Sequence, residues 1–380
     1  MICIKNASVV LEDGIIKNGV ILIDGEIIVG VGNEKDVKIP DNTETVDAQG
    51  AYVGPGFVDI HVHGGGQYMF HDDASKAAEH FLSYGETTVL ATLYYDLTKE
   101  RFLEAVKDVK NAMKTSQNIG GFYMEGPYMN PKYGAAAEKN KWKGEIKAED
   151  YKELVDLAGD DVKVWAVAPE REGLEPFMAY AERVNRNVCF AVGHSEATPS
   201  QVQALKKYGI RLQTHCTNAT GRVNESGGVR GVGPDEACFL DDDMYAEVIC
   251  DSLAIHVKPD MIKMIIKIKG IDKVILISDS FVSYEKNPEK YAHVTDLSFD
   301  ANGGLCGSKL TLDAAARNFM KHTGRGIRDA FLVSSTNPAK AVGMFDSVGS
   351  IKVGKLANLV FTDENINVKK IMLKGSFIGG

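Results

Sequence analysis

Apolar, strand-like runs alternate with amphipathic helical stretches between residues 57 and 279, and this pattern constrains the fold most strongly. Strands rich in Val and Ile, joined by helical crossovers, indicate a parallel sheet that is buried on both faces. Eight strands are predicted, over Phe57–His63, Thr88–Tyr94, Gly120–Glu125, Val162–Ala168, Val188–His194, Arg211–His215, Ala246–Asp251 and Lys273–Asp279. Helices are predicted between them, for example over Lys99–Lys114, Leu174–Val184, Pro199–Tyr208 and Pro259–Lys269. Eight such units over about 250 residues match a (β/α)8 barrel of the TIM type, with a doubly wound open sheet as the alternative.

Both ends of the chain differ from this central region, because they contain short strands separated by turns. The C-terminal segment, for example, carries the apolar runs Ala357–Phe361 and Lys370–Leu373. The termini of a domain often lie close together, so we expect these two ends to pair. The prediction is an α/β protein with a small β-sandwich domain formed by residues 1–53 and 346–380, beside a barrel domain of residues 54–345.

Charge and composition narrow the functional classes. A net charge of −9 argues against a broad nucleic-acid-binding surface, because such surfaces are strongly basic. No apolar run approaches the roughly 20 residues of a membrane span, and the first residues lack a signal-peptide pattern. The six cysteines are scattered without a Cys-x-x-Cys pair, which suggests reduced thiols. We therefore expect a globular protein, cytoplasmic and of a composition ordinary for an enzyme, that binds neither nucleic acid nor membrane.

Polar residues stand at the C-terminal ends of the predicted strands, where barrel enzymes build their active sites. His61 and His63 are two residues apart on the first strand, so their side chains point to the same face. Two buried imidazoles are costly to desolvate, and a bound metal ion removes that cost; the alternative is two core histidines hydrogen-bonded to backbone. Further strands end in Glu125, His194, His215 and Asp279. Four histidines and two carboxylates match the ligands of Zn²⁺ or a similar divalent ion.

Several motifs give the chain a family resemblance. The most specific is Glu125-Gly126-Pro127-Tyr128-Met129-Asn130-Pro131, which is similar to an EGP-aromatic-x-NP motif. Others are His61-Val62-His63, Gly193-His194-Ser195, Ile277-Ser278-Asp279, Leu305-Cys306-Gly307-Ser308 and the segment from Val333 to Ala339. Through these motifs, along nearly its whole length, the chain resembles the amidohydrolase superfamily and, within it, the N-acetylglucosamine-6-phosphate deacetylase family.

The resemblance implies a metal centre with one or two divalent ions per subunit. Glu125, His194 and His215 would hold one ion, and His61 with His63 would hold the second in members that carry this pair. Zn²⁺ is the first expectation, with Fe²⁺ or another divalent ion as alternatives. A homodimer is also implied, because some members complete the phosphate site with an arginine from the partner subunit.

The implied activity is hydrolysis of the acetamide of N-acetylglucosamine 6-phosphate to glucosamine 6-phosphate and acetate, in amino-sugar catabolism. Asp279 at the barrel mouth would act as general base and then as general acid; the alternative is a carboxylate that caps the next turn. Substrate contacts are implied for His256 at the N-acetyl carbonyl, Asn218 and Ala219 at the sugar phosphate, Arg222 or Arg230 at the phosphate group, and Leu305 in its loop motif.

Other features leave alternatives open. After Gly134-Ala135 the family carries a His or Gln that touches the sugar, whereas this chain continues with Ala136-Ala137. A related N-acetyl compound, such as N-acetylgalactosamine 6-phosphate, is therefore an alternative substrate. The alternative for His256 is a histidine at the start of a helix, before Pro259, and Arg222 and Arg230, each taken singly, are better explained as solvated loop charges. The third hypothesis is a non-catalytic barrel that serves as an interaction protein, and the complete ring of ligand candidates argues against it.

Overall fold

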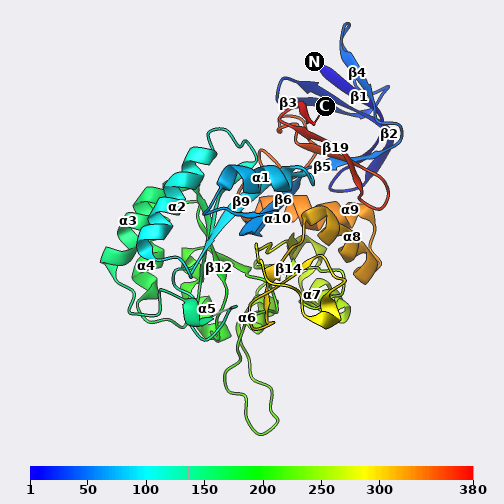
Figure 1. Ribbon diagram of the computed structural model, residues 1–380. Helices are drawn as coiled ribbons and strands as arrows, with labels where there is room; N and C mark the ends of the chain where they lie inside the picture. The colour runs from blue at the N-terminus through cyan, green and yellow to red at the C-terminus, as the bar shows by residue number, and fades with distance from the viewer. Residues whose placement is uncertain (136, 380) are drawn as a thin grey trace.

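The computed structural model describes residues 1–135 and 137–379 (Figure 1). Its centre is a sheet of eight strands whose spatial order follows the chain, with parallel neighbours throughout. The strands are β6 Phe57–Val62, β9 Glu86–Tyr94, β10 Ile119–Glu125, β11 Val162–Val167, β12 Cys189–Val192, β13 Ile210–Gln213, β14 Tyr245–Ile249 and β15 Val274–Ile277. Each overlaps a strand predicted from the sequence, so the eight-strand prediction is confirmed.

Hydrogen bonds from the segment after β15 join the two outer strands of this sheet. The backbone N–H of Asp279 donates to His61 O over 2.9 Å, and the N–H of His63 donates to Ser280 O over 2.9 Å. Every residue of β6 and β15 is buried, as expected for strands with both faces covered. The sheet is therefore a near-closed barrel of the TIM type, and the open doubly wound alternative is wrong.

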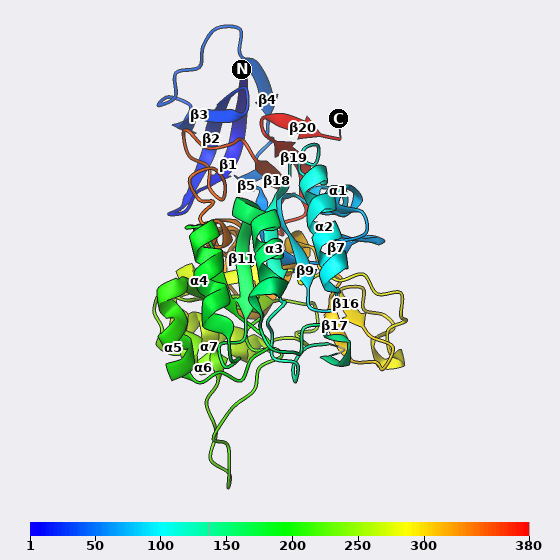
Figure 2. The ribbon, with the colours of Figure 1, turned by 90° about the vertical axis from the view of Figure 1, so that its left-hand side faces the viewer.

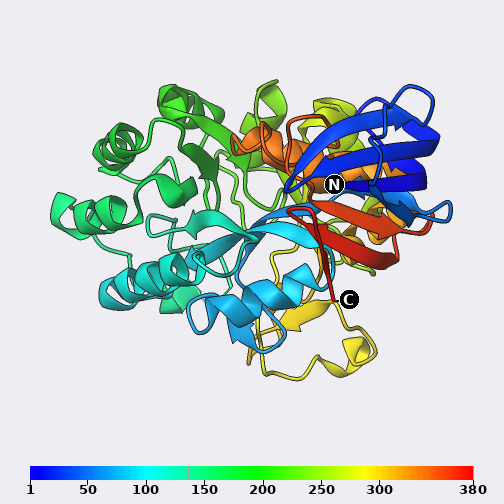
Figure 3. The same ribbon diagram turned by 90° about the horizontal axis from the view of Figure 1, so that it is seen from above.

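Helices surround the barrel (Figure 3). They are α1 Ala74–Leu82, α2 Lys99–Ala112, α3 Ala148–Ala158, α4 Leu174–Val184, α5 Pro199–Leu205, α6 Pro234–Leu240, α7 Pro259–Lys269 and α8 Leu312–Thr323. On α2, Phe102, Val106 and Val109 lie about one turn apart and are fully buried, and each such side chain stabilises the fold by about 1.5–3 kcal/mol. Thr98 begins this helix by accepting a hydrogen bond from Arg101 N.

Among the described residues, no helix combines the length and the apolar character that a membrane span requires.

A second, mixed sheet is built from both ends of the chain (Figure 2). Its order is β20-β19-β18-β5-β1-β2-β3, and β4 pairs with β1. The strands are β1 Ile2–Val10, β2 Ile15–Asp24, β3 Ile27–Asn33, β4 Glu44–Asp47, β5 Tyr52–Pro55, β18 Leu359–Thr362, β19 Val368–Leu373 and β20 Ser376–Ile378. The pairing of β5 with β18 joins the N-terminal and C-terminal segments, which confirms the β layer expected from both termini. The domain boundaries themselves stay a prediction.

Short elements fill the connections. The loops after β6 and β15 carry two small antiparallel pairs, β7 Gly64–Gly65 with β8 Tyr68–Met69, and β16 Leu297–Phe299 with β17 Leu305–Ser308. The chain then passes through α9 Ile327–Phe331, a π-helical turn Leu332–Thr336 and α10 Asn337–Ala341. Phe331 stacks on Phe57 of β6 with ring centroids 5.5 Å apart. A β-carbon at Gly54 would lie 2.4 Å from the Phe331 ring, so this crossing from the mixed sheet to the barrel requires glycine.

Candidate metal centre and active-site cavity

The six predicted metal and catalytic residues meet at the C-terminal end of the barrel. Glu125 is the last residue of β10, whereas His194, His215 and Asp279 each lie two residues beyond the end of a strand. The backbone φ angles of His194, His215 and Asp279 are 44°, 29° and 46°, in the left-handed region that residues other than glycine rarely adopt. Such backbone strain costs about 1–3 kcal/mol per residue and gathers at functional sites. Here the sharp turn after each strand directs the side chain into the barrel mouth.

Glu125, His194 and His215 form the first of two clusters with metal-ligand geometry. The Nε2 atoms of His194 and His215 lie 2.7 Å and 3.2 Å from Glu125 Oε1, and 3.1 Å from each other. The second cluster consists of His61, His63 and Asp279. In it, His63 Nε2 is 3.2 Å and His61 Nε2 is 3.7 Å from Asp279 Oδ1.

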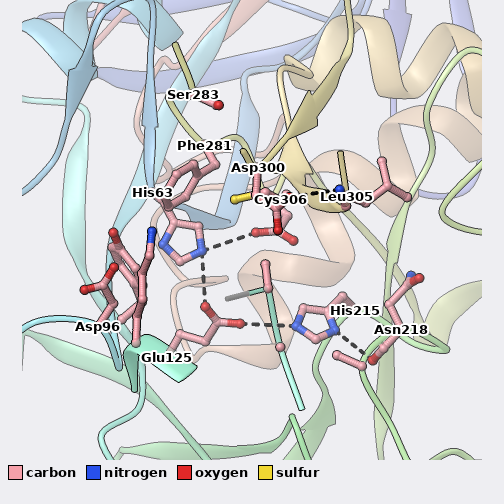
Figure 4. A pocket seen from close by; sticks show the side chains of 18 of the residues that line it. His63, Asp96, Glu125, His215, Asn218, Phe281, Ser283, Asp300, Leu305 and Cys306 are labelled. Carbon is pink, nitrogen blue, oxygen red and sulfur yellow. Dashed lines mark hydrogen bonds and ion pairs between the residues drawn. The ribbon is translucent and has the colours of Figure 1, made fainter. Parts of the chain in front are cut away.

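Glu125 connects the two clusters (Figure 4). Its Oε1 faces the histidines of the first cluster, while its Oε2 lies 3.2 Å from His63 Nε2 in the second. One carboxylate thus contacts both groups. Glu125 would therefore be within reach of a cation held by either cluster.

The donor atoms fit a divalent metal ion. The Nε2 atom of His61 is buried and has no hydrogen-bond partner among the described residues. His215 Nδ1 lies 3.1 Å from the Asn218 carbonyl oxygen, which only accepts, so a neutral His215 ring carries its proton on Nδ1 and presents a bare Nε2 to the cluster. Unpaired polar atoms cost free energy in a buried site, and a bound cation would satisfy them. Imidazole nitrogen and carboxylate oxygen together suit Zn²⁺ and other first-row divalent ions.

Both carboxylates of the centre are held in the ionised state. Burial acts to raise the pKa of Glu125, but the charges of His194 and His61, with hydrogen bonds from His194 and His215, lower that pKa well below its usual range. Burial also acts to raise the pKa of Asp279, and this is outweighed by the His63 hydrogen bond and the histidine charges, which lower it. An ionised carboxylate can ligate a cation or accept a proton from water.

A cavity of about 670 Å³ opens above this centre. His63, Glu125, His194, His215 and Asp279 line its base, and His61 is buried beneath them. Four of the residues predicted to contact substrate also line the cavity, namely Asn218, Ala219, His256 and Leu305. The structure therefore brings most of the predicted site residues into one place, although their individual roles stay predictions. Ala136, part of the sequence departure noted above, lies outside the described residues.

His256 is held in the cavity wall by hydrogen bonds at both ring nitrogens. Its Nδ1 lies 3.0 Å from Asp251 Oδ2, and its Nε2 lies 3.1 Å from Gly307 O. Asp251 also accepts from the backbone N–H groups of Ile255 and His256, which fixes the loop that carries the imidazole. Burial acts to raise the pKa of Asp251, and these hydrogen bonds outweigh it and lower the pKa.

Arg222 and Arg230 lie on a long hairpin that projects away from the barrel (the loop at the bottom of Figure 1). Neither is among the cavity-lining residues. Arg230 donates to Glu236 Oε1 over 2.8 Å, and Arg222 Nε lies 3.6 Å from the same oxygen. The cavity therefore does not include the two predicted phosphate ligands, and their role stays a prediction.

Sequence reasoning missed two charged residues near the centre. Lys139 is the one lysine or arginine among the described residues that line the cavity. It ends the short 3₁₀ turn Ala137–Lys139 in the loop after β10, where no periodic signal in the sequence indicates which way a side chain points. Glu247 is fully buried in β14 and contacts His61. A charged residue within an apolar strand was a usable signal for Glu247, because buried charges need partners.

Comparison with protein families places the chain in a class. The model described as the amidohydrolase family matches residues 52–378. This chain belongs to the amidohydrolase family.

Similarity to individual proteins narrows the comparison from the family to one kind of enzyme, the N-acetylhexosamine-6-phosphate deacetylases. The chain is 27% identical over 391 residues to the N-acetylglucosamine-6-phosphate deacetylase of Haemophilus influenzae, with 98% of each chain covered. It is 29% identical over 338 residues to the N-acetylgalactosamine-6-phosphate deacetylase of Escherichia coli O157:H7, covering 84% of this chain and 86% of that one. The crystal structure of N-acetylglucosamine-6-phosphate deacetylase from Pasteurella multocida matches with a TM-score of 0.86 at 26% identity, covering 100% of this chain and 99% of that one.

Proposed function

We propose that this protein hydrolyses the acetamide of an N-acetylhexosamine 6-phosphate, N-acetylglucosamine 6-phosphate first, to give acetate and the amino sugar phosphate. The observation that carries the proposal is the pair of ligand clusters at the base of a cavity whose wall holds His256. The activities of the Haemophilus influenzae and Escherichia coli relatives support it, since both are N-acetylhexosamine-6-phosphate deacetylases.

An acetamide resists hydrolysis because water is a weak nucleophile and the amine is a poor leaving group. Divalent ions held by the two clusters would supply a Lewis acid and lower the pKa of a bound water toward ~7. Asp279, ionised and at the cavity base, would take a proton from the water that attacks the acetyl carbon. The same carboxyl group would then return the proton to the departing amine nitrogen, so that one residue serves as base and acid in turn.

The acetyl carbonyl oxygen gains negative charge as water adds to the carbonyl carbon. His256 would stabilise this charge by donating a hydrogen bond from its Nε2–H, which would exchange Gly307 O for the substrate oxygen while Nδ1–H stays on Asp251. The pairing with Asp251 fixes the orientation of the ring before substrate binds, which reduces the cost of aligning it.

Phosphate recognition would use the wall and rim of the cavity. Asn218 and Ala219 line the wall, and Lys139 offers a cation from the rim. Charge-assisted hydrogen bonds to a phosphate are about twice as strong as neutral ones. The hairpin with Arg222 and Arg230 would reach the cavity of a second copy in a homodimer, which is how the projecting loop would contribute to binding.

Similarity to the Escherichia coli relative supports a second candidate substrate for this protein. That relative is an N-acetylgalactosamine-6-phosphate deacetylase, and its 29% identity to this chain is similar to the 27% of the Haemophilus influenzae N-acetylglucosamine-6-phosphate deacetylase. The absence of the family's His or Gln after Gly134-Ala135 is consistent with a different contact to the sugar ring. The two sugars differ in the orientation of one hydroxyl group, so ring contacts would decide between them.

Acetate release from a panel of N-acetyl sugars, each with and without the 6-phosphate, tests the proposal. The protein loaded with Zn²⁺ or Fe²⁺ should release acetate from one of the two hexosamine 6-phosphates with a kcat/KM at least about 100-fold above the unphosphorylated sugar. Equal turnover of both forms would contradict the phosphate requirement. No acetate from any member of the panel, by protein that contains its metal ions, would contradict the proposed function.

A further inference from the structure

Glu247 lies in the barrel interior below both ligand clusters, and none of the roles proposed above uses it. It is the third residue of β14, and its side chain is 0% exposed. Its neighbours on the strand, Ala246 and Val248, are apolar and buried. A carboxylate in such surroundings costs several kcal/mol unless other groups compensate its charge. Its presence therefore calls for a partner.

The partners of Glu247 belong to the metal centre. Its Oε2 atom lies 3.3 Å from His61 Nδ1, in the second cluster. The same oxygen accepts from the backbone N–H of His215, in the first cluster, at 3.4 Å. It also accepts from the Tyr123 hydroxyl at 3.4 Å. One carboxylate oxygen thus contacts residues of both clusters from below.

Tyr123 strengthens this arrangement. Its ring stacks on the His61 imidazole with centroids 4.3 Å apart and an interplanar angle of 29°. Its hydroxyl is 2.8 Å from Thr214 Oγ1, beside His215. The His61 ring is therefore held on one face by Tyr123 and at Nδ1 by Glu247, which leaves it little freedom to rotate.

The contact with Glu247 also fixes which nitrogen of His61 carries the proton. An ionised carboxylate only accepts hydrogen bonds, so Nδ1 must donate. Nε2 then presents its lone pair to the cluster, 3.6 Å from Glu125 Oε1 and 3.7 Å from Asp279 Oδ1. Within the His61 and His63 pair, only His61 has such an anchor, because the buried Nδ1 of His63 has no hydrogen-bond partner among the described residues.

We propose that Glu247 is a positioning residue that presets His61 as a ligand and thereby makes the His61–His63–Asp279 cluster a second metal site. The inference rests on the metal centre of the proposed function, but it does not depend on which compound is hydrolysed. The added negative charge below the cluster favours a cation there as well, because it remains unscreened by solvent. Outer partners of this kind typically change metal affinity by 10–100-fold.

Metal binding by three variants tests this role without measuring turnover. Glu247→Gln keeps the shape and an acceptor oxygen, and Glu247→Leu removes both charge and acceptor. Glu86→Gln is the matched control, because Glu86 is also fully buried in a barrel strand but accepts from Leu312 N, away from the histidines. Zn²⁺ per subunit is measured by elemental analysis after equilibration with chelators of increasing strength, alongside thermal unfolding of each variant.

We expect two ions in the wild-type protein and in Glu86→Gln. In Glu247→Leu the affinity for one ion should fall by about 10–100-fold, in Glu247→Gln by less, and the affinity for the other ion should stay within about 3-fold. If Glu247→Leu does not fold, the selective weakening of one ion in Glu247→Gln decides the matter.

Three results would overturn the inference: wild-type affinity for both ions in the Glu247 variants, an equal loss of both ions in the Glu247 and Glu86 variants, or a wild-type protein that binds a single ion. Failure of the proposed function is distinguishable, because it would leave two bound ions and no acetate release.

Discussion

The base of the cavity and its rim are built in different ways. The cavity base, defined as His61, His63, Glu125, His194, His215 and Asp279, consists of buried side chains linked by contacts of 2.7 to 3.7 Å. The rim carries Lys139, Asp96, Glu285 and Asp300, and the two hairpin arginines lie beyond it with side chains 39% and 66% exposed. Strand ends fix the base, whereas loops form the rim. The comparison suggests that the base determines the reaction and the rim determines the substrate.

The largest effect should come from removing the base carboxylate that moves the proton. Asp279→Asn should lower kcat by about 10³-fold, within the range for general acid–base catalysis, while the protein stays folded and keeps the ion bound by Glu125, His194 and His215. Glu285→Gln removes an exposed carboxylate from the rim instead and should change kcat by about twofold, as surface substitutions do. Steady-state acetate assays of both variants check this. Equal losses in the two variants would erase the proposed difference between base and rim.

Replacing a histidine of the base should remove metal and activity together. His215→Ala should lose one ion per subunit and about 10²-fold in turnover, because Lewis acid stabilisation is worth several kcal/mol. His293, which is exposed, supplies the control: His293→Ala should keep both the metal content and the rate. Elemental analysis of the purified variants makes the comparison. Unchanged stoichiometry in His215→Ala would remove it from the ligand set.

In the cavity wall, the contribution of Asp251 to the free energy of unfolding should depend on pH. Asp251→Asn should cost about 2 kcal/mol of unfolding free energy at pH 7, because a buried carboxylate with several donors is replaced by an amide. The folded pKa of Asp251 is lowered, so its stabilising contribution is present above its unfolded pKa, about 3.9, and is lost as pH falls through the folded value. The gap between wild type and variant should therefore shrink below about pH 4. Denaturant unfolding of the two metal-free proteins measures it, and a gap that widens on acidification would contradict this sign.

The smallest effect should come from the rim. Lys139→Ala should raise KM for the phosphorylated substrate by about 10-fold, equivalent to about 1.4 kcal/mol, and leave kcat nearly unchanged. Lys132→Ala is the matched control, since Lys132 pairs with Glu196 and does not line the cavity. Kinetics with phosphorylated and unphosphorylated sugar separate the two lysines. A lower kcat with an unaltered KM would move Lys139 from substrate binding to catalysis.

The sequence predicts the base better than the rim for a physical reason. Apolar runs that end in His or Asp mark strand ends whatever their distance along the chain, and parallel strands bring those ends to one side of the barrel. His61, His194 and Asp279 were identifiable in this way, and the structure brings them together. Glu247 could not be identified in this way, because it lies in the middle of β14 and not at its end.

Loop geometry carries no comparable signal. Arg222 and Arg230 look like phosphate ligands in the sequence, yet the hairpin carries them away from the cavity, where both face Glu236. The approach of Lys139 to the same cavity depends on the path of an irregular loop after β10, which no periodicity encodes. The fold and the ligand ring are therefore predictable from residue patterns, and the substrate contacts depend on tertiary structure.

Acetate release from N-acetylglucosamine 6-phosphate before and after metal removal tests the central claim most directly. The same preparation is assayed as loaded protein, after chelation and dialysis, and after return of Zn²⁺ or Fe²⁺, with ions per subunit counted at each stage. The account predicts release of one acetate per sugar by the loaded protein, loss of at least about 99% of the rate in the metal-free protein, and recovery on reloading. Full turnover by protein shown to be free of metal would contradict it.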